Sequence, residues 1–154
     1  MLRTRIVLGM LVGTLAVSNA NASEKQIVRS DLPPAVEKTV AAHTSGAVVR
    51  GFSQEEENGK TLYEAELTVN GHSKDILIDA KGSVVAVEEE VPLASLPPSV
   101  QAGLKARAGN GRIEKVESIT KHDRLVAYEA RVDFNGKKSG VQVGPEGKPL
   151  VHAE

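Results

Sequence analysis

Apolar and polar residues alternate along two stretches of the chain that resemble each other. In Tyr63–Gly71 the apolar positions are 63, 65, 67 and 69, and in Tyr128–Gly136 they are 128, 130, 132 and 134. A period of two is typical of a strand with one buried face. Each stretch ends in Asn-Gly, the dipeptide that best fits the two positive-φ positions of a type I′ turn. Each stretch is therefore predicted to enter a β-hairpin.

The likeness extends to the segments around these stretches. A helix pattern begins with Leu-Pro-Pro at Leu32 and again at Leu96, and proline is tolerated in the first helical turn. The strands predicted after the first helix are 47–54, 60–69, 72–79 and 83–89. The sequence predicts an α+β fold of two tandem repeats, each one helix followed by a four-stranded antiparallel meander, with the helices on one face of the sheet. The predicted boundaries are a polar lead-in at 23–30 and repeats at 31–91 and 92–154.

The first residues have the order of a secretory signal peptide. Arg3 and Arg5 are basic, residues 6–17 are apolar, and Ala20-Asn21-Ala22 is a small-x-small cleavage site. A membrane anchor would need about 20 apolar residues. We expect residues 1–22 to be removed after Ala22, and the mature protein to be periplasmic or secreted with no membrane association.

Composition excludes several functional classes. Without Arg3 and Arg5 the chain carries 17 basic and 20 acidic residues, a net charge of −3. This balance argues against a nucleic-acid partner, because neutralising phosphates requires a basic face. The chain has no cysteine, which excludes thiol nucleophiles, iron–sulfur clusters and cysteine-ligated zinc.

No residue pattern indicates catalysis or a resident cofactor. The histidines are scattered over different predicted elements without metal-ligand spacing. They are His43, His72, His122 and His152. The acidic runs 55–57 and 88–90 lack the alternation and central glycine of an EF-hand, and such runs are usually solvated charge. We therefore predict a protein that is not an enzyme, with no cofactor and no metal.

The uncovered face of the sheet is the best functional candidate. Alternation places Glu64 and Glu129 there, where cross-strand pairing with Lys or Arg is the simplest role for them. The alternative is the ordinary wet face of an antiparallel sheet. The candidate partner-binding residues on this face and in the hairpin loops 55–59 and 121–124 are Glu55, Glu56, Glu57, Glu64, Glu66, Asp123, Glu129, Arg131 and Asp133.

Several short motifs together resemble the exported PepSY-like domains over roughly residues 31–152. They are Leu-Pro-Pro-x-Val at a helix start, Tyr-Glu-Ala in a later strand, Asn-Gly, and a closing (Asp/Gly)-x-x-Gly turn. That family is grouped with the β-lactamase inhibitor protein, so the resemblance implies tandem helix-plus-strand units. It also implies a binding or inhibitory module that docks on a protein partner, such as a hydrolase, through the sheet face and hairpin loops. In that inhibitor an acidic loop residue mimics substrate, and the nearest positions here are Glu55–Glu57 and Asp123.

A second function remains open from the residues themselves. The acidic loops have oxygen ligands of the kind that calcium prefers. The alternative to a protein-docking module is therefore an envelope sensor that binds a small ligand or a metal ion such as calcium.

Overall fold

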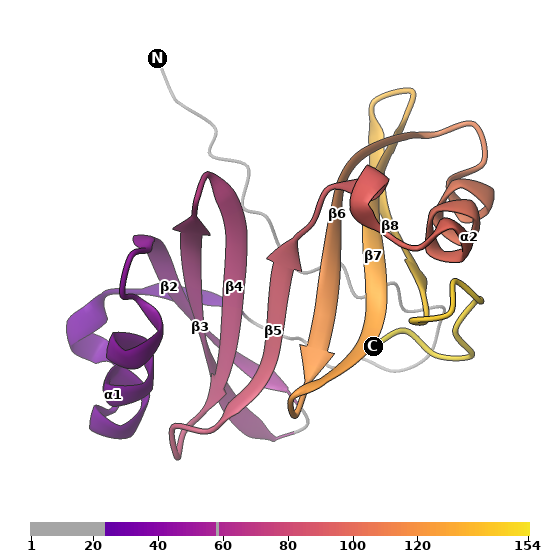
Figure 1. The fold of residues 1–154 in the computed structure, drawn as a ribbon. Helices are drawn as coiled ribbons and strands as arrows, with labels where there is room; N and C mark the ends of the chain where they lie inside the picture. The colour runs from indigo at the N-terminus through magenta and orange to yellow at the C-terminus, as the bar shows by residue number, and fades with distance from the viewer. Residues whose placement is uncertain (1–23, 58) are drawn as a thin grey trace.

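The computed structural model describes residues 24–57 and 59–154 (Figure 1). The predicted signal peptide therefore lies outside the described residues. The helices are α1 (Pro34–His43) and α2 (Pro98–Ala108), each preceded by a short 3-10 helix, η1 (Arg29–Asp31) and η2 (Leu93–Ser95). The strands are β1 (Lys25–Ile27), β2 (Val48–Glu57), β3 (Lys60–Val69), β4 (His72–Asp79), β5 (Val84–Glu90), β6 (Arg112–Lys121), β7 (Arg124–Phe134) and β8 (Lys137–Val143).

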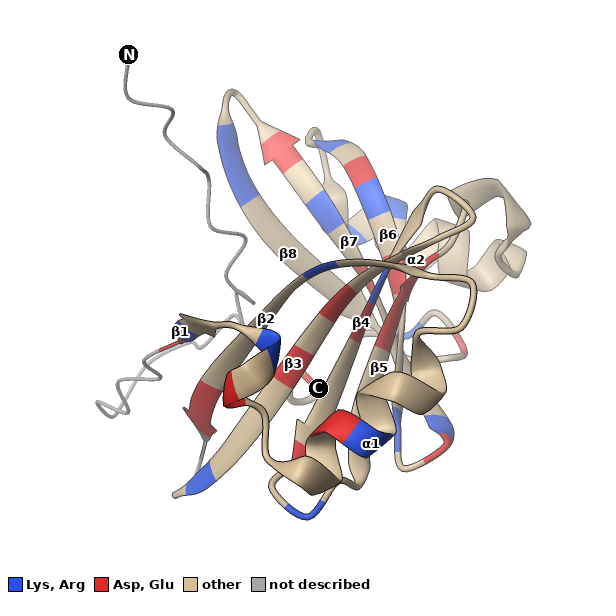
Figure 2. Cartoon of the chain, turned by 90° about the vertical axis from the view of Figure 1, so that its left-hand side faces the viewer, with Lys and Arg blue, Asp and Glu red and all other residues tan. Residues whose placement is uncertain are grey.

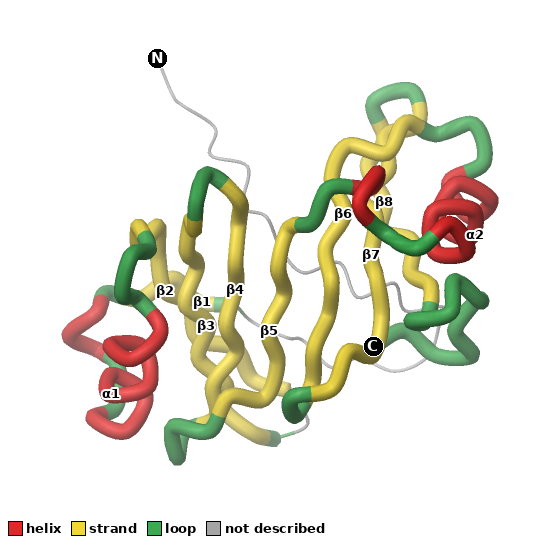
Figure 3. The backbone as a smooth tube through the Cα atoms, in the orientation of Figure 1, coloured by secondary structure: helices red, strands yellow, loops and turns green. Residues whose placement is uncertain are grey.

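Within the described part of the chain, the eight strands form one continuous antiparallel sheet in the order β1 to β8 (Figure 3). Even β5 and β6, which are separated in the chain by α2, pair directly, with Ala86 opposite Lys121 and Glu90 opposite Glu117. The two halves of the chain therefore share backbone hydrogen bonds across the middle of the sheet. Among the described residues, no helix is both long enough and apolar enough to cross a membrane.

The prediction of two repeats, each a helix followed by a four-stranded meander, is wrong. Three strands follow α2, and after β8 the chain makes only an isolated bridge between Val143 and Pro149. Pro149 has no N–H group to continue a ladder, which explains why no further strand forms there. The eighth strand is instead β1, which lies in the predicted polar lead-in and pairs Lys25–Ile27 with the edge of β2.

Several local predictions are confirmed. The strands β3 and β4 have the predicted bounds. Both Asn-Gly pairs form two-residue hairpin turns with positive φ at both positions, 51° and 86° at Asn70-Gly71 and 53° and 82° at Asn135-Gly136. These turns follow from local backbone preferences, which the surrounding fold does not need to impose.

The predicted hairpin loops are shorter than expected. Strand β2 continues to Glu57, and Glu55 and Glu56 pair with Leu62 and Thr61 of β3. The loop expected at 121–124 is a two-residue turn, His122-Asp123, with φ of 49° and 60°. The acidic run 55–57 thus continues a strand because its partner strand is long enough to pair with it.

The apolar core lies in two clusters, one beneath each helix. Val36 and Val40 of α1 pack on residues of β2, β3 and β4 that include Leu67 and Ile76. Val100 and Leu104 of α2 pack on residues of β6, β7 and β8 in the same way. Cross-strand partners share a face of the sheet. Ala65, Ile76, Val87 and Thr120 are successive cross-strand partners from β3 to β6. Ala65 and Ile76 lie beneath α1, and Thr120 is on the same side of β6 as Val116, which lies beneath α2. Both helices therefore lie on the same face of the sheet.

The opposite side of the sheet is here called the open face. It is formed by side chains that point away from both helices, among them Ser53, Glu64, Glu66, Asp75, Leu77, Ala86, Glu88, Glu90, Lys115, Glu117, Ile119, Lys121, Ala127, Glu129, Arg131 and Gln142.

Candidate functional site

Carboxyl side chains cross the middle of the open face from β3 to β7. The cross-strand pairs Glu66–Asp75, Asp75–Glu88 and Glu117–Glu129 bring them close together. Figure 2 shows acidic positions near the middle of β3, β4 and β5. We call this set the carboxyl row, and its members are Glu64, Glu66, Asp75, Glu88, Glu117 and Glu129.

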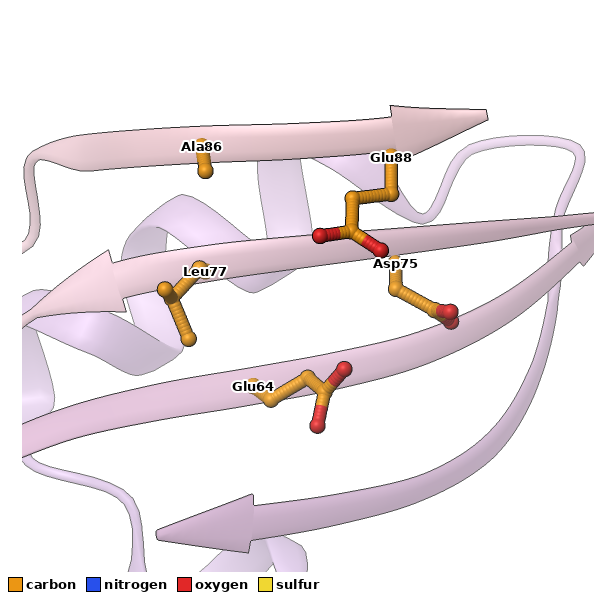
Figure 4. Close-up of a pocket in the computed structure, with 5 residues that line it drawn as sticks. All are labelled: Glu64, Asp75, Leu77, Ala86 and Glu88. Atoms are coloured by element: carbon orange, nitrogen blue, oxygen red, sulfur yellow. The ribbon is translucent and has the colours of Figure 1, made fainter. Parts of the chain in front are cut away.

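A shallow hollow lies in the carboxyl row. It is lined by Glu64, Asp75, Leu77, Ala86 and Glu88. In Figure 4 the side chains of Glu64, Asp75 and Glu88 lie at one end of the hollow, while Leu77 and Ala86 lie at the other. All three acids are partly buried. The hollow therefore combines neighbouring carboxyl side chains with an adjacent apolar surface.

Burial and mutual repulsion shift the protonation of these acids. Burial, assisted by the charge of Asp75, raises the pKa of Glu64 to about 7. Burial raises the pKa of Asp75 itself to about 6, against the opposing effect of Lys115. Burial and then the charge of Glu117 raise the pKa of Glu88 to about 8. Near neutral pH this part of the face therefore holds protons that solvated carboxyls would release.

The expected ion pairs of Glu64 and Glu129 do not form. The Glu64 carboxylate accepts a hydrogen bond of 3.0 Å from the Ser53 hydroxyl, and Glu129 accepts one of 2.6 Å from the Gln142 amide. Among the described residues no lysine or arginine lies within ion-pair distance of either acid. Burial also raises the pKa of Glu129, opposed by the Gln142 hydrogen bond. Both acids thus have neutral hydrogen-bond donors in place of cations.

The lysine beside the carboxyl row, Lys115, is already paired with one of its acids. Lys115 lies 2.5 Å from Glu117, and the two side chains are 15% and 11% exposed. Arg131 is opposite Lys115 in the ladder. At the β2 side Arg50 lies 4.0 Å from Glu66, at the outer limit of an ion pair. The negative charge in the hollow is consequently not neutralised by direct contact with a basic side chain.

A glycine makes room for the carboxylate at the β7 end of the row. A Cβ atom at Gly140 would lie 2.7 Å from Glu129 Oε1, so that carboxylate rests directly over the β8 backbone. At the other end, a Cβ atom at Gly51 of β2 would lie 3.6 Å from Glu66 Oε1, which is ordinary van der Waals contact. A glycine within a strand often marks a close approach of this kind, and that signal was present in the sequence.

The remaining predicted residues on the strands have structural partners. Asp133 accepts a hydrogen bond of 2.8 Å from the backbone N–H of Gly136 and lies 3.7 Å from Arg112. It therefore stabilises the second Asn-Gly turn. The structure brings Glu64, Glu66, Glu129 and Arg131 together on the open face, whereas Asp133 belongs to the hairpin end.

The predicted loop acids lie apart from the row. Thr61 donates a hydrogen bond to Glu56, and the backbone of Glu57 pairs with Lys60. Glu55 is part of the same strand end, and Asp123 lies in the turn between β6 and β7. These residues occupy the ends of separate hairpins.

Sequence reasoning missed Asp75, Glu88 and Glu117. Glu88 stood within the acidic run 88–90, which was interpreted as solvated charge. In the structure Glu89 points to the helix side, where it lies 2.7 Å from Lys74, and Glu88 points to the open face. Strand alternation over 83–89 was the signal that separates these two neighbours.

The arrangement favours binding of a basic group over metal chemistry. Among residues 24–57 and 59–154, no three His, Asp or Glu side chains are placed to share a metal ion. The row offers partly buried acceptors, raised pKa values and an apolar surface beside them. Such a face is suited to cationic donors.

Comparisons with known proteins show the fold. No family profile matches the sequence, and no curated protein matches it significantly. The chain is similar to a candidate periplasmic protein from Bacteroides eggerthii, with a TM-score of 0.62 and 16% identity over 77% of this chain and 85% of that one. It is also similar to a DUF2874 family protein from Bacteroides ovatus, with a TM-score of 0.58 and 20% identity over 77% and 84%. A BLIP-like protein from Bacteroides fragilis has a TM-score of 0.56 and 19% identity over 78% and 84%.

These likenesses establish that the chain has the fold of BLIP-like and DUF2874 proteins. The resemblance to PepSY-like domains stays a prediction from the sequence motifs.

Proposed function

We propose that this protein is an exported, non-enzymatic binding module that docks on a basic segment of a protein partner through its open face. The observation that carries the proposal is the carboxyl row on a sheet face that neither helix covers. The candidate signal peptide and the fold shared with a candidate periplasmic protein support a periplasmic location. Fold alone does not imply function, so the argument rests on the site.

The energetics of the row favour a functional role. Partly buried carboxylates of like charge oppose folding unless a cation compensates them. Burial raises the pKa of Glu64 to about 7 and that of Glu88 to about 8, and no cation offsets this burial in the hollow. A lysine or arginine from a partner would supply the charge and hydrogen bonds that this chain does not provide there.

The shape of the hollow fits the same kind of partner. Leu77 and Ala86 lie beside the carboxyl groups. Lysine and arginine side chains place their alkyl stems on apolar surface while their charged ends reach polar groups. Because one fold relative is a BLIP-like protein, envelope hydrolases are the first class of partner to test, with inhibition as the expected consequence of docking.

Binding of short charged peptides tests the proposed function. We expect tetralysine amide to bind at low ionic strength and tetraglutamate to bind far more weakly, as measured by isothermal titration calorimetry. At about pH 9, where the Glu88 carboxyl is ionised, Glu88→Gln should weaken tetralysine binding about tenfold, the effect of losing one partly desolvated charge contact.

A matched control is available on the same strand. Glu89→Gln removes the same charge from the opposite face, where Glu89 pairs with Lys74, and should leave tetralysine binding nearly unchanged. Equal weakening by both variants would show that only net charge matters and would overturn docking at the hollow. A calcium titration of the unmodified protein distinguishes the sensor alternative, which predicts a calcium-dependent rise in melting temperature.

A further inference from the structure

The chain returns to the open face after β8. It turns at Gly144–Gly147, where the Gly144 N–H donates to Lys148 O at 2.8 Å, and Pro149 then bridges to Val143. Leu150 packs next to Gly144, since a Cβ at that glycine would lie 3.2 Å from Leu150 Cδ2. Residues up to 150 are therefore held against the end of β8.

The next four residues, 151–154, are here called the strap. The backbone N–H of Glu154 donates to Gln142 Oε1 at 2.9 Å, and its side chain lies 3.6 Å from Lys121 Nζ. Lys121 ends β6 and Gln142 belongs to β8. Because β7 lies between those strands, the strap must cross the open face above β7. Ala127, which faces that side of β7, is fully buried.

Gln142 connects the strap to the carboxyl row. Its amide nitrogen donates to Glu129 at 2.6 Å and is 3.5 Å from the backbone oxygen of Glu154. The same side chain thus contacts one end of the row and the strap together. A ligand that extends along the row toward β8 would meet the strap at this residue.

We infer that the strap is an intramolecular cover for the end of the carboxyl row at Glu129, next to β8, and that a basic partner displaces it. This inference rests on the proposed function. The strap is weakly held, because its residues are all exposed, with Val151 at 91%, and exposed ion pairs contribute little. Displacement is therefore a small penalty on partner binding, and removing the strap should remove that penalty.

The charge of Glu154 makes the test discriminating. Glu154→Gln abolishes the ion pair with Lys121 and also removes one negative charge from the face. Electrostatic attraction alone predicts weaker binding of a cationic peptide to this variant. Release of a competing strap predicts tighter binding. We expect Glu154→Gln and a chain ending at Leu150 each to bind tetralysine amide about three- to tenfold more tightly than the unmodified protein.

The outcomes separate the two proposals. Equal or weaker binding by both variants, with clear binding by the unmodified chain, overturns the strap and leaves the proposed function intact. If none of the three chains binds any cationic peptide, the proposed function fails and the competing role of the strap fails with it. The NMR signals of the Gln142 side-chain amide provide a direct measurement. They should shift when the chain is truncated at Leu150, and also when tetralysine is added to the unmodified chain. Unchanged signals in both experiments would also overturn the inference about the strap.

Discussion

Unfolding of this protein is expected to require more urea at about pH 5 than at about pH 8.5. Burial raises the pKa of Glu64 to about 7, that of Asp75 to about 6 and that of Glu88 to about 8. The ordinary values are 4.5 for Glu and 3.8 for Asp. The folded state therefore binds protons that the unfolded chain has released.

The sign of the pH dependence follows from that difference. Below about pH 4 these groups are protonated in both states and do not oppose folding. As the pH rises to about 8 they ionise within the folded protein, and stability falls. We expect a loss of about 3 kcal/mol across this window, allowing for their partial exposure. Acids with lowered pKa, such as Asp79 with its hydrogen bonds from the Ser83 backbone, act below about pH 4 and leave the window unaffected.

A single substitution should flatten the profile. At about pH 8.5, Glu88→Gln should increase the free energy of unfolding by about 2 kcal/mol, because it removes an ionised carboxylate from the hollow. At about pH 5 it should have little effect. Glu89→Gln, on the helix side of the same strand, should leave the pH profile unchanged. Stability that rises from about pH 5 to about pH 8.5 would contradict this account of the row.

Stability and binding should move in opposite directions at Glu88. The substitution that stabilises the fold at high pH is also the one expected to weaken tetralysine binding. Such a trade-off is typical of functional sites, whose residues are not chosen for maximal stability. A variant that gained stability and bound the peptide equally well would argue for an ordinary wet sheet face.

Gly147→Ala is expected to destabilise the fold by about 3 kcal/mol or more. Gly147 has φ of 78°, and a Cβ there would lie 2.2 Å from the carbonyl oxygen of Ser99. From the facing side, a Cβ at Gly103 of α2 would lie 2.1 Å from Gly147 O. Backbone contacts leave no flexible side chain to move aside, so the turn or the helix must shift.

Gly46 provides the matched control for this effect. Its φ of 76° is close to the 78° of Gly147, but nothing lies within 4 Å of the position that a Cβ atom would occupy there. Gly46→Ala should therefore cost about 1 kcal/mol, the effect of the positive φ alone. Urea unfolding of both variants measures the difference. If Gly147→Ala costs no more than Gly46→Ala, the close packing of the turn on α2 does not contribute to stability.

Gly82 packs against the backbone of α1 as Gly147 packs against that of α2. Its φ is 86°, and a Cβ there would lie 2.6 Å from the carbonyl oxygen of Ala35 in α1. Gly82 and Gly147 are the last residues of the two (Asp/Gly)-x-x-Gly motifs in the sequence. The structure shows that both turns pack against the N-terminal part of a helix, although the two halves of the chain differ in their strands.

Part of the candidate site followed from alternation alone. The spacing of Tyr63 and Glu64, and of Tyr128 and Glu129, correctly predicted that these acids lie away from the core. Pairing register was not contained in that pattern. The pairing register places Asp75 opposite Glu88 and puts Gln142 within hydrogen-bond distance of Glu129. The acids therefore form a partly buried row, and the ion pairs expected for Glu64 and Glu129 do not form.

The sequence by itself determined the local elements: the helix starts at the proline pairs, the bounds of β3 and β4, and the two Asn-Gly turns. These depend on backbone preferences and side-chain periods that act over a few residues. Only the tertiary structure decided that β5 pairs with β6, that Lys25–Ile27 becomes a strand, and that carboxyls from five strands form one row. Those features depend on which edges meet and on how much water the neighbouring strands exclude, and both are set by contacts between residues far apart in the chain.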